Sequence, residues 1–198
     1  MDAMQHYRQA LDGVDAVLAD VRPERWDGPS ACPEWTVRDV AGHLIWGQWQ
    51  LQAWATGAPD PDGRGAPGAP RPGELAGPDP VAVWRSARAE SVATLTPAAL
   101  DRTVALPGLG EVPVAGVVTL LITDLVAHTW DVGHALGVDV RLDPGLVALA
   151  HDWARAHVVR RPGFFGPELT PPPGSDEQTR MLAFLGRAAW RPAPVTSS

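Results

Sequence analysis

The segment that decides the fold covers residues 114–136 and reads VAGVVTLLITDLVAHTWDVGHAL. Taking every third or fourth residue gives one helical stripe, made of Val117, Leu121, Asp124, His128, Asp131 and Ala135. A second, wholly apolar stripe runs beside it, made of Val118, Ile122, Leu125, Val132 and Leu136. The segment is therefore predicted to be a helix buried over a wide face. Its first stripe begins apolar and turns ionisable halfway along.

An earlier predicted helix brings one more imidazole to the edge of the core. Its apolar stripe consists of Val37, Val40, Leu44, Leu51 and Trp54. His43 borders this stripe, and Thr36 with Asp39 has the spacing of a capping box at the start of the helix. A buried imidazole or carboxylate without a partner costs several kcal/mol, so these ionisable groups need compensation.

Apolar periodicity and capping signals predict an all-α fold. The expected helices cover about residues 2–21, 36–57, 79–95, 114–136 and 143–159, and a short sixth helix is capped by Ser175 and Gln178. Residues 103–114 predict an extended excursion or a short β-hairpin. The expected architecture is a bundle of four long helices with additional C-terminal helices.

The composition predicts one domain. With 198 residues, 45% of them hydrophobic, we expect a single helical-bundle domain over residues 1–190 and a frayed tail over residues 191–198. Residues 57–79, rich in Gly, Pro, Ala and Asp, are expected to form a long loop, mobile or draped over the surface. No signal peptide is recognisable, and the longest apolar run, residues 112–122, is too short for a bilayer. A cytoplasmic protein without a membrane partner is expected.

Charge and cysteine content exclude several classes of function. A net charge of -7 without a basic stripe argues against nucleic acid as a partner. All 16 basic residues are Arg, which excludes Schiff-base chemistry on a lysine. Cys32 is the single cysteine, so no intramolecular disulfide can form. Because no His lies near it in the sequence, a small buried residue at a helix entrance is favoured over a nucleophile.

The polar groups suggest a metal site. Asp124 and His128 leave the same helix face one turn apart, and His43 is the best third ligand. Two imidazoles and one carboxylate with open positions describe a catalytic site for a divalent metal, zinc by default, with iron, nickel or cobalt also accepted. The alternative is an ion pair of Asp124 with His128 and a hydrogen-bonded core His43. The spacing of Asp124 and His128 alone favours that alternative, and His43 and Asp131 tip the balance toward the metal.

Three further residues are candidates for the site. Asp131 can accept a hydrogen bond from a ligating imidazole, move protons as a catalytic residue, or pair with an arginine. Among the nine tryptophans, Trp46 and Trp130 are candidates for lining a substrate pocket, with core filling as the alternative.

Two segments carry a family resemblance: residues 30–43 (SACPEWTVRDVAGH) and residues 123–131 (TDLVAHTWD). They resemble the metal-binding N-terminal domain of mycothiol-dependent maleylpyruvate isomerases, within the DinB-like group. Residues 184–187 (FLGR) resemble the end of single-domain members. The resemblance implies a DinB-like four-helix bundle that holds a divalent metal through His43, Asp124 and His128. The family frequently has Glu at the position of Asp124.

The function implied by this resemblance is a metal-dependent thiol transferase or isomerase, with mycothiol as cosubstrate and a small electrophilic substrate. The aromatic residues near the predicted site suit an apolar substrate. A metal lowers the pKa of a bound thiol and supplies a nucleophile without Cys32. Two alternatives stay open. One is a thiol-independent hydrolase, lyase or cyclase of specialised metabolism, in which the metal polarises a carbonyl or activates water. The other is a non-catalytic metal- or small-molecule-binding module, which an exposed helix face would allow to form a homodimer.

Overall fold

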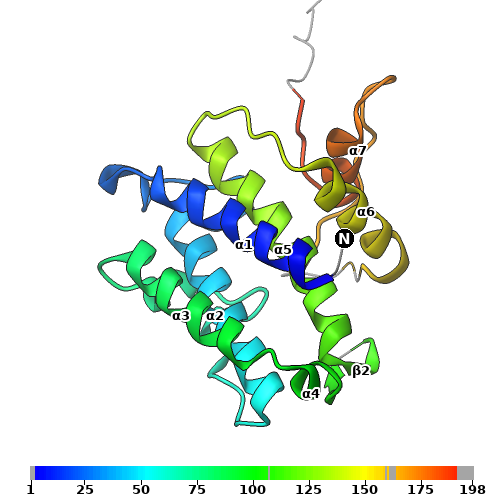
Figure 1. The fold of residues 1–198 in the computed structure, drawn as a ribbon. Helices are drawn as coiled ribbons and strands as arrows, with labels where there is room; N and C mark the ends of the chain where they lie inside the picture. The colour runs from blue at the N-terminus through cyan, green and yellow to red at the C-terminus, as the bar shows by residue number, and fades with distance from the viewer. Residues whose placement is uncertain (1–2, 107, 159, 161–163, 191–198) are drawn as a thin grey trace, which may run out of the picture.

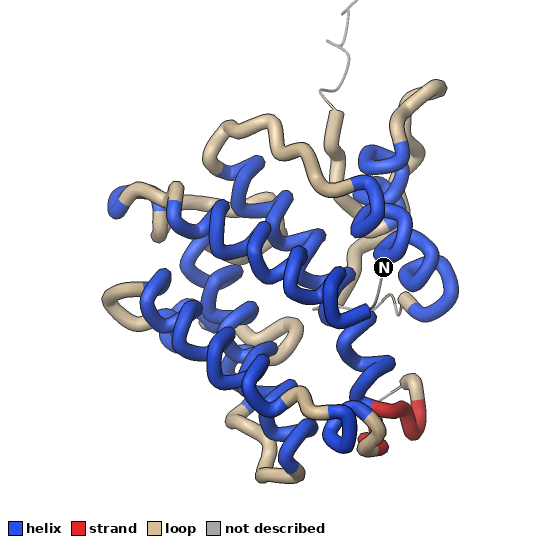
Figure 2. The backbone as a smooth tube through the Cα atoms, in the orientation of Figure 1, coloured by secondary structure: helices blue, strands red, loops and turns tan. Residues whose placement is uncertain are grey.

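The computed structural model describes residues 3–106, 108–158, 160 and 164–190 (Figure 1). Within them the chain forms seven α-helices and one two-stranded antiparallel sheet, which confirms the expected all-α fold with a hairpin. The helices are α1 (Ala3–Ala19), α2 (Val37–Thr56), α3 (Pro80–Thr94), α4 (Pro97–Leu100), α5 (Val114–Ala135), α6 (Pro144–His157) and α7 (Glu177–Phe184). The strands are β1 (Thr103–Leu106) and β2 (Gly110–Pro113), red in Figure 2.

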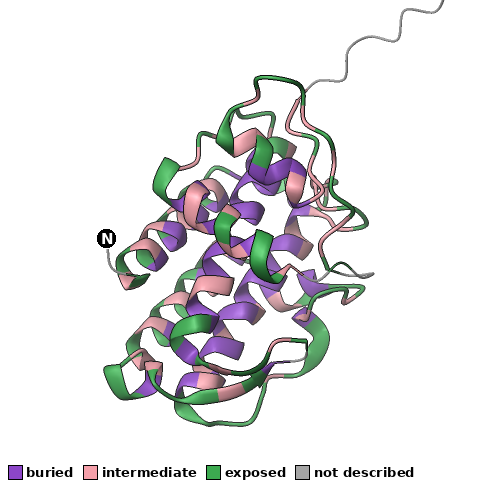
Figure 3. Ribbon diagram, turned by 90° about the vertical axis from the view of Figure 1, so that its right-hand side faces the viewer, coloured by how far each residue is buried: buried purple, intermediate pink, exposed green. Residues whose placement is uncertain are grey.

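The four long helices α1, α2, α3 and α5 form the bundle. α1 packs along α5, and α2 packs against both α3 and α5. The shorter α6 and α7 pack on each other, and α6 also contacts α5. The apolar face of α1 is fully buried, with Tyr7, Leu11, Val14 and Leu18 at 0% exposure. Buried residues gather where the helices face one another (Figure 3).

The start of α2 is the capping box that the sequence predicts. The Thr36 hydroxyl accepts from the Asp39 amide, and the Asp39 carboxylate accepts from the Thr36 amide. The other Asp39 oxygen accepts from the amide of Gly73 at 2.9 Å. The same carboxylate therefore begins the helix and holds a distant loop against it.

Helix α5 is the central element of the core. Both predicted stripes contain residues that are at most 1% exposed: Val117 in the first, and Val118, Ile122 and Val132 in the second. By length and mean hydropathy α5 could cross a bilayer, but 72% of its most apolar window is buried inside the fold. In this structure it is a core helix.

Two details of the C-terminal region differ from the sequence prediction. α7 is capped by Asp176, whose carboxylate accepts from the Thr179 amide at 2.8 Å, and not by Ser175. The Gln178 side chain does not form a capping box but bonds to the backbone of Leu142 and Val140, because it faces the segment before α6. The predicted frayed tail, residues 191–198, lies outside the described residues.

The Gly/Pro-rich loop of residues 57–79 drapes over α2. It contains two 3-10 turns, η2 (Gly63–Gly65) and η3 (Pro72–Ala76), and η3 packs closely on α2. At the crossing the backbones meet so closely that a Cβ on Gly42 would overlap the carbonyl oxygen of Pro72. Glycine at position 42 therefore allows the loop to lie against the helix.

This close approach predicts opposite effects for two glycines of one helix. Gly42→Ala should lower the free energy of unfolding by about 1–3 kcal/mol, because the added methyl group overpacks the α2–η3 contact. Gly47→Ala is the matched control, since its Cβ would lie 3.9 Å from Leu121, an ordinary contact. It should be neutral or stabilising by up to about 1 kcal/mol through helix propensity. Urea unfolding measures both, and equal stability of the two variants would contradict the prediction.

Candidate metal site

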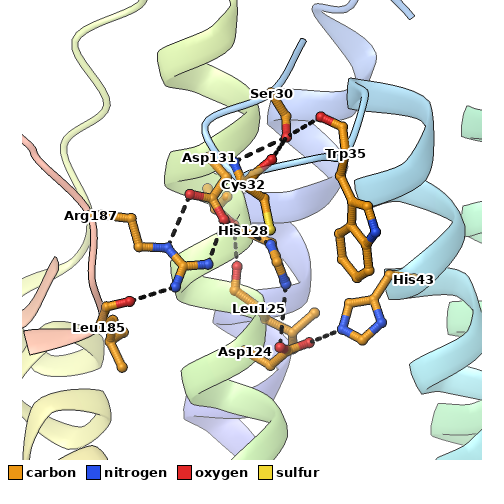
Figure 4. A network of polar contacts seen from close by, with 11 residues as sticks. Ser30, Cys32, Trp35, His43, Asp124, Leu125, His128, Asp131, Leu185 and Arg187 are labelled. Atoms are coloured by element: carbon orange, nitrogen blue, oxygen red, sulfur yellow. Dashed lines mark hydrogen bonds and ion pairs between the residues drawn. The ribbon is translucent and has the colours of Figure 1, made fainter. Parts of the chain in front are cut away.

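The structure brings together the three residues predicted to bind a metal. His43 comes from α2, and Asp124 and His128 come from α5 one turn apart (Figure 4). The Nε2 atoms of His43 and His128 each lie 3.4 Å from the nearer oxygen of the Asp124 carboxylate. One donor atom from each residue lies within 4.8 Å of the other two.

Hydrogen bonds at Nδ1 set the orientation of both imidazole rings. His43 Nδ1 lies 2.7 Å from the carbonyl oxygen of Gly65, in the loop of residues 57–79. A carbonyl oxygen can only accept, so Nδ1 of His43 carries the proton. His128 Nδ1 lies 2.9 Å from a carboxylate oxygen of Asp131, which likewise accepts. In the neutral state both rings therefore present an Nε2 lone pair toward Asp124, the arrangement typical of metal-ligating histidines.

The spacing of the donor atoms fits a small cation. Charge-assisted N–H···O bonds are usually about 2.7–2.9 Å long, so 3.4 Å is long for a simple ion pair. Zinc bonds of about 2.0–2.1 Å in a tetrahedron put neighbouring ligand atoms about 3.3–3.4 Å apart. Two separations of this length are compatible with a shared cation as well as with the ion-pair alternative.

The charges of neighbouring groups shift the pKa values of Asp124 and His128. Burial alone would raise the pKa of the Asp124 carboxyl, but the two facing imidazoles hold it well below its usual range. Burial alone would lower the pKa of His128, but Asp124 and then Asp131 raise it to about 9. The Asp124 side chain is 21% exposed, while His43 and His128 are each 6% exposed. The site is thus enclosed except on the Asp124 side.

Asp131 combines two of the roles that the sequence left open. Its carboxylate accepts from His128 and from the guanidinium of Arg187, whose Nη2 lies 2.8 Å from Oδ2. Although burial would raise the pKa of Asp131, the charges of Arg187 and His128 lower it to about 2. Ionised and engaged on both oxygens, Asp131 is placed to orient His128. Its role in proton transfer stays a prediction.

The aromatic residues divide into two groups. The Trp46 ring stacks on His43 with 6.3 Å between centroids, and its indole N–H donates to the Asp62 carbonyl of the loop. Trp130 stacks on His134 instead, at 4.5 Å. Two residues after His128, it points to the other side of α5, so the structure does not bring Trp130 to the site.

Trp35 lies beside the candidate site, although the sequence analysis did not single it out. Its ring centroid lies 5.0 Å from that of His43 and 6.1 Å from that of His128. Its indole N–H donates to the carbonyl of Ala69, in the loop of residues 57–79. The signal available in the sequence was its place in the segment that carries the family resemblance.

Cys32 lies closer to the site than its sequence neighbours suggest. It sits in the turn before α2, and its sulfur forms a second group of potential donors with His128 and Asp131. Burial, reinforced by the negative charge of Asp131, raises the pKa of the Cys32 thiol to about 12. The thiol is therefore protonated at neutral pH, in agreement with the interpretation as a small residue at a helix entrance.

This fold and this site define a class: an all-α bundle with a candidate metal centre between two of its core helices. Residues 7–133 match the family model of the mycothiol maleylpyruvate isomerase N-terminal domain. The chain belongs to this family, as its sequence motifs predict.

Two relatives extend the similarity beyond the matched domain. Both come from Mycobacterium tuberculosis, from strains CDC 1551 and H37Rv, and both are named as uncharacterised proteins. Each is 33% identical to this chain over 193 residues, which covers 94% of this chain and 98% of the relative. No solved structure matches the chain.

The raised pKa of His128 predicts a pH dependence of stability. The pKa of histidine in an unfolded chain is about 6.5, and that of His128 in the folded protein is about 9. The resulting stabilisation is fully present below the lower value and is lost as the pH rises through the higher one. The free energy of unfolding of metal-free protein should therefore fall between about pH 6.5 and 9, by at most about 3 kcal/mol. Urea unfolding in a chelator measures this, and His128→Gln should flatten the profile. A rise over this window would contradict the assignment.

The donor set predicts which substitutions abolish metal binding. His43→Ala, Asp124→Ala and His128→Ala should each weaken zinc binding by at least about 100-fold, because each removes one of three ligands. His134→Ala is the control, since His134 is an exposed imidazole on the same helix. Competition with a chromophoric chelator gives the affinities. Wild-type affinity in all three variants would remove the site.

Proposed function

We propose that this protein is a metal-dependent enzyme in which a low-molecular-weight thiol, mycothiol, is transferred to a small electrophilic substrate or promotes its isomerisation. The observation that carries the proposal is the convergence of two oriented Nε2 atoms on the Asp124 carboxylate, at separations of 3.4 Å. Membership of the mycothiol-related family supports the choice of thiol. Zinc, a cytoplasmic location and a homodimer remain predictions from the sequence.

His43, Asp124 and His128 would hold the cation. When bound there, a divalent metal supplies Lewis acidity that lowers the pKa of a thiol and makes it a nucleophile at neutral pH. The partial exposure of Asp124 leaves one side of the site open to ligands from solvent. Three protein ligands with an open side are typical of catalytic rather than structural zinc sites.

The neighbouring residues prepare the site. Gly65 and Asp131 accept from Nδ1 of His43 and His128, so in the neutral rings Nε2 is the atom left free to bind a cation. The rings of Trp35 and Trp46 lie against His43 and restrict access of water from that side. They also suit an apolar substrate. Cys32, protonated by burial, does not compete as a nucleophile with the external thiol.

A cobalt-substituted protein tests the proposal. Mycothiol should produce a thiolate-to-cobalt charge-transfer band with the wild-type protein, because the thiol takes the open side of the site. S-methylated mycothiol is the matched control, since it retains the sugar and loses the ionisable sulfur. Loss of the band in Asp124→Ala would assign it to this site. A cobalt spectrum unchanged by mycothiol would count against the thiol chemistry and favour the thiol-independent alternative.

A further inference from the structure

Arg187 joins the C-terminal segment to the interior of the bundle. Its Nε lies 3.2 Å from Oδ1 of Asp131, and its Nη2 lies 2.8 Å from Oδ2, although the two residues are 56 positions apart. The side chain of Asp131 is fully buried, and that of Arg187 is 10% exposed. Such a two-bond contact between guanidinium and carboxylate fixes both distance and orientation.

The end of α7 places Arg187 with little freedom. The Arg187 amide donates to the Leu182 carbonyl at 2.8 Å, and the Gly186 amide donates to the Ala183 carbonyl at 3.0 Å. With Gly186 at φ 83°, these two bonds form a Schellman motif. Arg187 Nη1 also donates to the Leu185 carbonyl, and the guanidinium lies 5.6 Å from the ring centroid of Phe165. The guanidinium group of Arg187 is therefore held in position by contacts other than those with Asp131.

The same carboxylate oxygen serves both partners. Oδ2 of Asp131 accepts from Arg187 Nη2 and from His128 Nδ1, as Figure 4 shows. Arg187 donates hydrogen bonds to both oxygens, so the carboxylate cannot rotate without breaking one of them. Breaking a buried hydrogen bond of a charged group costs free energy. The fixed carboxylate in turn restrains the orientation of the His128 ring through the hydrogen bond at Nδ1.

We propose that Arg187 is a positioning residue of the candidate metal site, acting through Asp131 to keep His128 Nε2 directed at Asp124. The proposal deepens the proposed function and rests on it only in taking His128 as a metal ligand. It also gives α7 and its C-terminal turn a role, although they lie beyond the residues 7–133 that match the family model. The competing explanation is that Arg187 only anchors the C-terminal segment.

Three variants of the full-length chain separate these explanations. Arg187→Met removes the fork, and Arg187→Lys keeps the charge but cannot bind both oxygens in a plane. Arg180→Met is the control, because Arg180 also lies on α7 but bonds to the Ser175 carbonyl. Arg187→Met should weaken zinc binding about 10–100-fold, in the range for loss of groups that orient a ligand. Arg187→Lys should fall between it and the wild type, and Arg180→Met should leave the affinity unchanged.

A second readout detects the His128 ring directly. In zinc-loaded wild-type protein, the 15N shifts of His128 should show a protonated Nδ1 and a metal-bound Nε2. They should change in both Arg187 variants, while the His134 ring stays as in the wild type. A role in anchoring alone would lower the thermal midpoint without moving these shifts. Wild-type zinc affinity together with wild-type His128 shifts in the Arg187 variants overturns the proposal; if Arg187→Met does not fold, Arg187→Lys decides.

The outcomes also distinguish this proposal from the proposed function. A wild-type chain that binds no zinc overturns both. A chain that binds zinc, loses affinity in the Arg187 variants and gives no response to mycothiol supports the role of Arg187 and contradicts the thiol chemistry.

Discussion

The arrangement of this site depends on one constraint: each imidazole is bound at Nδ1 by an acceptor that has no proton to give. Gly65 plays this part for His43 and Asp131 plays it for His128. Both Nε2 atoms are thereby turned toward the Asp124 carboxylate. Three parts of the chain contribute to these contacts. The bundle supplies Asp131, the loop over α2 supplies the Gly65 carbonyl, and the C-terminal turn supplies Arg187.

Much of this could be predicted from the sequence, because apolar periodicity and capping act locally. The stripes of α5 and the capping box of α2 predict both helices and place Asp124, His128 and His43 at the edge of the core. The α7 cap was wrong by one residue, since Ser175 and Asp176 are both good caps and only the fold decides which side chain reaches the Thr179 amide. Element type was thus more predictable than the exact boundary.

The contacts behind the ligands were not predictable from sequence patterns. Gly65 acts through its backbone carbonyl, and Arg187 reaches Asp131 across 56 positions. Neither contact leaves an apolar period or a fixed spacing to recognise. The same holds for Trp130, where a position two residues from His128 suggests closeness but puts the ring on another side of the helix. Sequence patterns indicate which residues lie on the same face of a helix. They do not indicate which polar groups distant in the sequence will pair, because that depends on the fold.

The loop of residues 57–79 shows how a segment without apolar periodicity can be specified. Side chains of α2 and its preceding turn hold it by single hydrogen bonds: Trp35 to Ala69, Trp46 to Asp62 and Asp39 to Gly73. A Cβ at Gly65 would overlap Trp46, so glycine is what lets the carbonyl at this position approach His43. The loop thus supports His43 through the Gly65 carbonyl, and a stretch that looks like a flexible connection forms one wall of the candidate site.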